Sequence, residues 1–145
     1  MYRHTQTGYV ILVTVGVVAA ALGAWVYQGF LPGLVYLVAA ALVIALVLFS
    51  SLTVEVNHEA ITLRFGVGLV RRRFLLADVT AVQVVRNRWW YGWGIHTVGS
   101  GWLYNVSGLD AVELQFSDGR ADRIGTDEPE LLCRAIRNFR GLPAN

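Results

Sequence analysis

Two apolar runs, at residues 9–27 and 34–52, account for most of the N-terminal third of the chain. Neither run contains an aspartate, glutamate, lysine or arginine. Each is about 19 residues long, and at a rise of about 1.5 Å per residue such a helix nearly spans the hydrocarbon core of a bilayer. The link at residues 28–33 contains Pro32 and Gly33, which end one helix and start the next. The pattern predicts an antiparallel hairpin of two transmembrane helices.

The arginines around the two runs predict the orientation of this hairpin. Arg3 precedes the first run, Arg64 and residues 71–73 follow the second, and the link between the runs contains no cation. Because positive charge is retained on the cytoplasmic side, we expect both termini in the cytoplasm. A cleavable signal peptide ending near residues 22–24 is the competing interpretation, but its apolar run is too long for a typical signal core.

Beyond the second run the spacing of apolar residues changes from that of helices to that of strands. Val54 and Val56 alternate with Thr53 and Glu55, and similar alternation recurs to residue 124. A period of two is typical of half-buried antiparallel strands. Residues 1–8 read as a polar tail. We place seven strands near residues 53–57, 60–66, 69–76, 79–86, 102–106, 111–117 and 120–124.

A helix is predicted at the C-terminal end of the chain. Thr126 or Asp127 caps it and Pro129 fits its first turn. Cys133, the single cysteine, falls within this helix, where it is expected to be a small core residue, and it excludes an internal disulfide. Apolar residues at helical spacing form the expected buried stripe: Leu132, Ile136 and Phe139.

Together these elements predict an α+β chain with a membrane hairpin at residues 1–52 and a second domain at residues 53–145. About seven strands closed by one helix is the outline of a pleckstrin-homology-like (PH-like) antiparallel barrel or sandwich. Three segments, WYGWGI at 90–95, GWLYNVSGLDAVEL at 101–114 and RIGTDEPELL at 123–132, resemble small bacterial membrane proteins that carry a PH-like domain after two transmembrane helices. His96 departs from that pattern, in which an arginine usually follows. The resemblance implies a multi-pass protein of the bacterial inner membrane and no enzyme activity.

The charge, the histidine positions and the absence of known motifs argue against nucleic-acid binding, metal binding and catalysis. All 12 cations are arginine and the net charge is only +2, far from the strongly basic footprint of a nucleic-acid-binding domain. The three histidines are isolated, so no metal site is predicted. We find no nucleophile elbow and no phosphate-binding glycine motif, and therefore expect neither a catalytic site nor a cofactor.

Two groups of residues are candidates for contact with a partner. Arg86, Arg88, Trp89, Trp90 and Tyr91 combine the residue types that dominate protein interfaces. The alternatives are that this loop dips into the headgroup layer of the membrane, or that it folds back and buries its rings as core.

The second group is Arg71, Arg72 and Arg73, which lie in a predicted strand. Alternation sends Arg71 and Arg73 to one face and Arg72 to the other, from which they could attract anionic lipid.

The leading hypothesis is a non-catalytic adaptor or assembly module that contacts a membrane-protein partner through residues 86–91. The alternatives are an anionic-lipid-sensing domain that uses residues 71–73, and a homo-oligomeric structural membrane protein. Small residues four apart, such as Gly16 and Ala20, favour either helix association between copies or close packing within the hairpin, and the latter is preferred.

Overall fold

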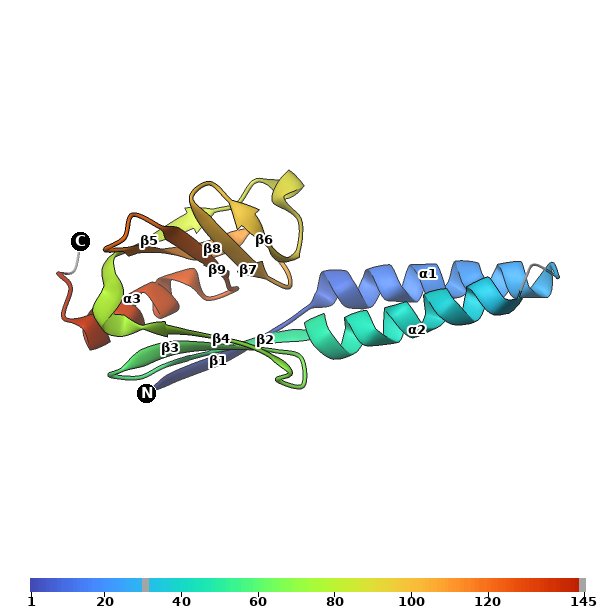
Figure 1. The fold of residues 1–145 in the computed structure, drawn as a ribbon, viewed down its shortest axis with the longest axis horizontal. Coiled ribbons are helices and arrows are strands. Elements are labelled where there is room, and N and C mark those ends of the chain that lie inside the picture. The colour runs from blue at the N-terminus through green and yellow to red at the C-terminus, as the bar shows by residue number, and fades with distance from the viewer. Residues whose placement is uncertain (30–31, 144–145) are drawn as a thin grey trace.

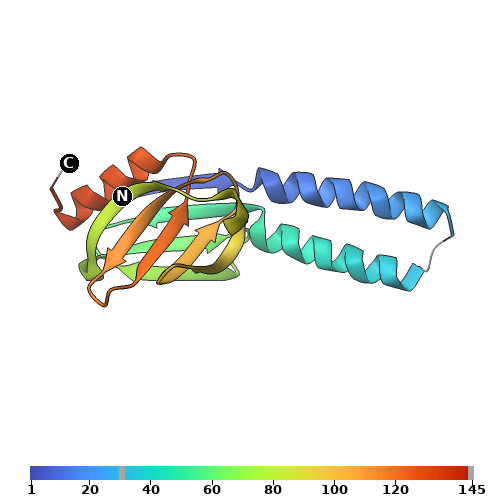
Figure 2. The ribbon, with the colours of Figure 1, turned by 90° about the horizontal axis from the view of Figure 1, so that it is seen from above.

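The computed structural model describes residues 1–29 and 32–143, and it consists of a long helical hairpin joined to one end of a two-sheet domain (Figure 1). Helix α1 (Tyr9–Tyr27) and helix α2 (Pro32–Phe49) lie side by side (Figure 2). By length and composition α1 is apolar enough to cross a membrane, and α2 is a slightly shorter apolar helix. The second predicted helix therefore begins and ends earlier than residues 34–52, and residues 30–31 of its link lie outside the described chain.

The first sheet contains four antiparallel strands in the order β1-β2-β3-β4. The polar-tail interpretation of residues 1–8 is wrong, because Tyr2–Thr7 forms strand β1 and pairs with β2 along its whole length. Its polar sequence gives no alternation, and only pairing with a distant strand makes it extended. The other strands, β2 (Ser51–Val56), β3 (Ala60–Phe65) and β4 (Val70–Leu75), lie close to their predicted positions.

The second sheet contains five strands in the order β5-β8-β9-β7-β6. The expectation of purely antiparallel pairing is corrected here, because β7 and β9 are parallel neighbours. Strand β6 was not predicted from the sequence, because its short GIHTV segment is flanked by glycines. The strands are β5 (Val79–Arg86), β6 (Gly94–Val98), β7 (Gly101–Asn105), β8 (Asp110–Phe116) and β9 (Ala121–Gly125), with 3-10 turns η1 (Leu76–Asp78) and η2 (Trp89–Tyr91).

The core lies between the two sheets and under the C-terminal helix α3 (Pro129–Arg140). Helix α3 buries Leu132, Cys133 and Ile136, as its spacing predicts, and Phe139 is half-buried against them. Burial raises the pKa of the Cys133 thiol, as expected for a structural core cysteine. No side chain at its N-cap bonds the helix; instead the hydroxyl of Thr126 accepts a hydrogen bond from the Glu128 amide at 3.1 Å.

Helix α3 also protects an edge of the second sheet. Strand β5 is an edge strand, and its carbonyl groups would otherwise face solvent. Arg137 Nη2 donates to the Val82 carbonyl at 2.7 Å, and Arg140 Nε donates to the Val79 carbonyl at 3.0 Å. The opposite edge is different: β4 and β6 are not paired with each other, so the described residues form an α+β sandwich and not a closed barrel.

The hairpin is joined to the domain by backbone contacts at the end of α2. The Gly8 amide donates to the Ser50 carbonyl at 2.7 Å, and the Val67 amide donates to the Val47 carbonyl at 3.3 Å. Val47 belongs to the last turn of α2, where carbonyls lack partners within the helix, and Ser50 is the residue that follows the helix. A Cβ on Gly66 would collide with the Val47 carbonyl, so only glycine allows this approach.

Candidate interaction surface at the helix-facing end of the domain

The aromatic loop, residues 86–93, lies at the end of the domain nearest to the helical hairpin (Figures 1 and 2). Strand β5 ends at Arg86, and η2 follows after two residues. Trp89 and Trp90 are 72% and 57% exposed, so the loop does not bury their rings in the core. The interpretation in which this loop folds back and buries these two rings is therefore wrong.

The aromatic loop is ordered by contacts among its own side chains. The Trp89 and Trp90 rings meet edge to face at 5.9 Å, and the Trp90 and Tyr91 rings do so at 6.2 Å. The Arg88 guanidinium lies 5.0 Å from the centre of the Trp90 ring, a cation–π contact. Gly92 has a φ of 72°, which turns the chain sharply after η2. These contacts present the tryptophans as a preformed surface.

A polar network anchors the root of this loop on the sheet face opposite the core. Glu113 accepts hydrogen bonds from Arg123 Nε and Gln83 Nε2, both at 2.8 Å. Asn87 is buried between Arg86 and Arg88, and its Oδ1 accepts from Arg123 Nη1 at 3.3 Å. Burial alone would raise the pKa of Glu113, but the hydrogen bonds and the charge of Arg123 outweigh it and lower that pKa. The carboxylate therefore stays ionised and holds the loop in place.

The turn between β3 and β4 lies at the same end of the domain. Its two apolar residues, Val67 and Leu69, are 69% and 73% exposed. The turn is fixed beside the last turn of α2 by the Val67–Val47 hydrogen bond. Arg71 supports the turn from the β4 side, where its Nε donates to the Gly68 carbonyl at 2.6 Å. The exposed side chains of Val67 and Leu69 are thus held beside the C-terminal end of the apolar helix α2.

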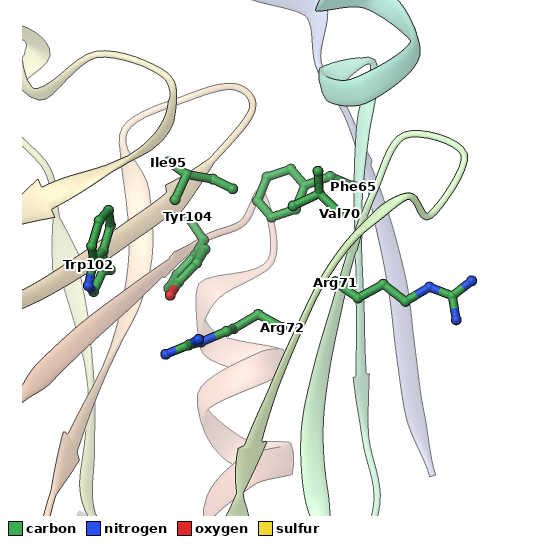
Figure 3. Close-up of a pocket in the computed structure, with 7 residues that line it drawn as sticks. All are labelled: Phe65, Val70, Arg71, Arg72, Ile95, Trp102 and Tyr104. Atoms are coloured by element: carbon green, nitrogen blue, oxygen red, sulfur yellow. The ribbon is translucent and has the colours of Figure 1, made fainter.

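The three successive arginines of β4 do not form one basic patch. Arg71 and Arg72 point to opposite sides of the strand, as alternation predicts (Figure 3). Arg73 forms an exposed ion pair with Glu59 at 3.2 Å. Arg72 instead lies over the Phe74 ring, with 5.7 Å between the guanidinium carbon and the ring centre. Each of the three side chains therefore has a different environment.

A cleft of about 280 Å³ lies between β4 and strands β6 and β7. Figure 3 shows Arg72 extending into it toward Tyr104 and Trp102. Burial raises the pKa of Tyr104, and the nearby Arg72 charge opposes part of that rise. Sequence reasoning did not find this cleft, although the Trp-x-Tyr spacing of β7 does indicate two aromatic rings on one face. Its remaining lining residues are Phe65, Val70, Arg71 and Ile95.

A second contact that the sequence did not reveal joins β1 to the start of α3. His4 Nε2 lies 2.6 Å from Asp127 Oδ1, and His4 Nδ1 lies 3.3 Å from Glu128 Oε2. Burial and the charge of Glu128 raise the pKa of Tyr2 to about 12. Within residues 1–29 and 32–143 no three His, Cys, Asp or Glu side chains are grouped as ligands for a metal ion.

Comparison with known proteins adds no family assignment. The sequence matches no protein-family model, and no curated protein matches it significantly.

Proposed function

We propose that this chain is an integral protein of the bacterial inner membrane with two spans and with both termini in the cytoplasm. Helices α1 and α2 carry no acidic residue in their first turns and no basic residue in their last turns, and both are apolar throughout. The 18 residues of α2 extend about 27 Å as a helix, close to the thickness of the hydrocarbon core. The positions of Arg3 and of residues 71–73 favour a cytoplasmic domain.

We further propose that the domain is a variant of the PH-like fold. Two facing sheets and one C-terminal helix support this assignment, together with the sequence segments that resemble that family. Three features extend the basic design: the N-terminal strand β1, the edge strand β6 and the parallel pair β7–β9. The membrane hairpin is inserted between β1 and β2, so both of its ends continue directly into neighbouring strands of the first sheet.

The function that this geometry supports best is a non-catalytic adaptor or assembly module whose partner is a membrane protein. The observation behind it is the exposure of Trp89 and Trp90 on a preformed loop at the helix-facing end of the domain. Arg86 and Arg88 flank these rings and pair with no carboxylate among residues 1–29 and 32–143. Clustered Trp, Tyr and Arg are the residue types enriched at binding hot spots.

A photo-crosslinking amino acid at position 89 tests this proposal in native membranes. The matched control carries the same group at Asp118, an exposed residue of the β8–β9 turn. We expect one discrete protein adduct from position 89 and none from position 118, and we expect Trp90→Ala to abolish that adduct. Adducts with lipid alone would refute the adaptor proposal, and a self-adduct would favour a homo-oligomer.

A second candidate function, contact with anionic lipid, is favoured by a different observation. Val67 and Leu69 are held beside the end of α2, where the bilayer interface would lie. Increasing salt distinguishes the two candidates, because attraction to anionic headgroups is screened at high ionic strength whereas packing of aromatic rings against a protein persists.

A further inference from the structure

The seam between the two sheets is open on the side of strands β4 and β6. These strands are the edges of their sheets, and the cleft of about 280 Å³ lies between them. Figure 3 shows that its lining changes character along its length. Phe65, Val70 and Ile95 lie at the end nearest to the helices, and Arg72 lies at the far end with the Tyr104 hydroxyl directed toward it.

The charge of Arg72 is not neutralised by a protein carboxylate. The neighbouring arginines of the first sheet are paired: Arg64 lies 3.3 Å from Glu55, and Arg73 lies 3.2 Å from Glu59. Among residues 1–29 and 32–143, Arg72 contacts the Phe74 ring and the Tyr104 side chain but no carboxylate. A guanidinium in a cleft without a counter-ion is a strong binding group for a phosphate.

Tyr104 adds a hydrogen-bond donor at the same end. Burial raises the pKa of its hydroxyl, so the group keeps its proton at neutral pH and can donate to an anion. The ring itself is fixed by edge contacts with Phe74, at 5.8 Å between ring centres. The donor therefore needs no rearrangement before binding.

The apolar end of the cleft adjoins the base of the hairpin. Phe65 packs against Phe49, the last residue of α2, with 5.8 Å between ring centres. Val70 begins β4 immediately after the exposed β3–β4 turn. If α2 ends at the membrane surface, this end of the cleft opens onto the bilayer interface. A free phosphate would leave the half-buried side chains of Val70 and Ile95 in contact with water, whereas a lipid would cover them.

We propose that the cleft binds one anionic phospholipid, with its phosphate between Arg72 and the Tyr104 hydroxyl and its glycerol and first acyl carbons against Val70 and Ile95. This proposal rests on the two-span membrane placement proposed above. It assigns Arg72 a role that Arg71 and Arg73 do not share. Binding of this kind would let the domain respond to the lipid composition of the leaflet that it faces.

The test uses the full-length protein reconstituted into nanodiscs of phosphatidylcholine and phosphatidylglycerol, followed by gentle detergent extraction and native mass spectrometry. We expect one phosphatidylglycerol to remain bound to the wild type. Arg72→Gln should lower that retention about tenfold, the change expected for one charge-assisted hydrogen bond. Arg73→Gln, on the next residue of the same strand, should retain the lipid fully. Ile95→Trp, which fills the cleft without changing charge, should also reduce binding.

Several results would overturn the proposal. Equal retention by the wild type and Arg72→Gln, with both variants folded by circular dichroism, excludes a role for that arginine. Equal retention of phosphatidylcholine, whose choline cation balances its phosphate, excludes the proposed preference for an anionic phospholipid, and displacement of the lipid by inorganic phosphate assigns the cleft to a free ion.

Alkaline carbonate extraction of native membranes shows whether the cleft proposal alone is wrong or whether the proposed membrane placement is wrong as well. Release of the protein refutes both proposals, whereas a protein that stays integral but shows equal lipid retention refutes only the cleft proposal.

Discussion

The Val67 amide donates a hydrogen bond to the Val47 carbonyl, and this contact connects a turn of the domain to the last turn of an apolar helix. Gly8 makes a second backbone contact, in which its amide donates to the carbonyl of Ser50. The Val67 bond satisfies a carbonyl that the helix terminus leaves unpaired, and the Gly8 bond joins the residue before α1 to the residue after α2. They also fix the direction of the hairpin relative to the sheets, so the same end of the domain always faces the base of the helices.

Gly66→Ala tests how strongly this junction depends on a glycine. Gly66 has a φ of 50° and its Cβ would collide with the Val47 backbone. Gly99 has a similar φ of 61° but no atom near its Cβ, so Gly99→Ala measures the backbone strain alone. We expect a loss of about 1 kcal/mol for Gly99→Ala and about 3 kcal/mol for Gly66→Ala. Thermal unfolding in detergent measures both, and equal losses would show that the junction tolerates a side chain.

Arg137→Met tests the protection of the β5 edge by helix α3. Methionine keeps the apolar stem but removes the donors that bond the Val82 carbonyl. We expect a loss of about 1–2 kcal/mol in the free energy of unfolding. Arg134 is exposed on the same helix, and Arg134→Met should change stability by less than about 0.5 kcal/mol. Urea unfolding followed by circular dichroism compares the two, and similar values would argue against a stabilising role for the Arg137 hydrogen bonds.

Glu113 gives the domain a specific dependence on pH. Its pKa in the folded state lies below the ordinary value of 4.5, so its contribution to stability is complete above about pH 4.5 and is lost as pH falls through the lowered folded pKa. Glu113→Gln should cost about 1–2 kcal/mol at pH 7 and should flatten the stability profile in acid. Unfolding midpoints between pH 7 and pH 3 test this, with Asp118→Asn as the exposed control. Parallel profiles for wild type and Glu113→Gln would contradict it.

The elements with strong periodicity could be predicted from the sequence. The alternation of β2, β3 and β8 and the helical spacing of Leu132 and Ile136 are local properties, and the structure confirms them. Strand β1 could not be predicted, because nothing in its polar sequence indicates a strand and its partner lies beyond the two helices. Its extended form depends on long-range pairing with β2.

In the candidate site, too, features set by neighbouring residues could be predicted from the sequence, whereas contacts between distant segments could not. Exposure of Trp89 and Trp90 required the structure, because clustered aromatics fit a buried or an exposed loop equally well. The cleft brings β4 together with β7, about 30 residues later in the chain, and no local pattern encodes that approach. Sequence alternation did separate Arg72 from Arg71, but it could not show that Tyr104 lies beside Arg72.

Leu69 provides the sharpest measurement of where the domain lies relative to the bilayer. A nitroxide label at Leu69→Cys, in a Cys133→Ser background, reports its surroundings through collisions with oxygen and with a water-soluble nickel chelate. Because the turn lies beside the end of α2, the label should be more accessible to oxygen than to the chelate. A label at Asp118→Cys, an exposed site in the β8–β9 turn, should show the reverse. If both labels behave as fully aqueous, the turn does not reach the bilayer, and the membrane placement must then be tested on the helices alone.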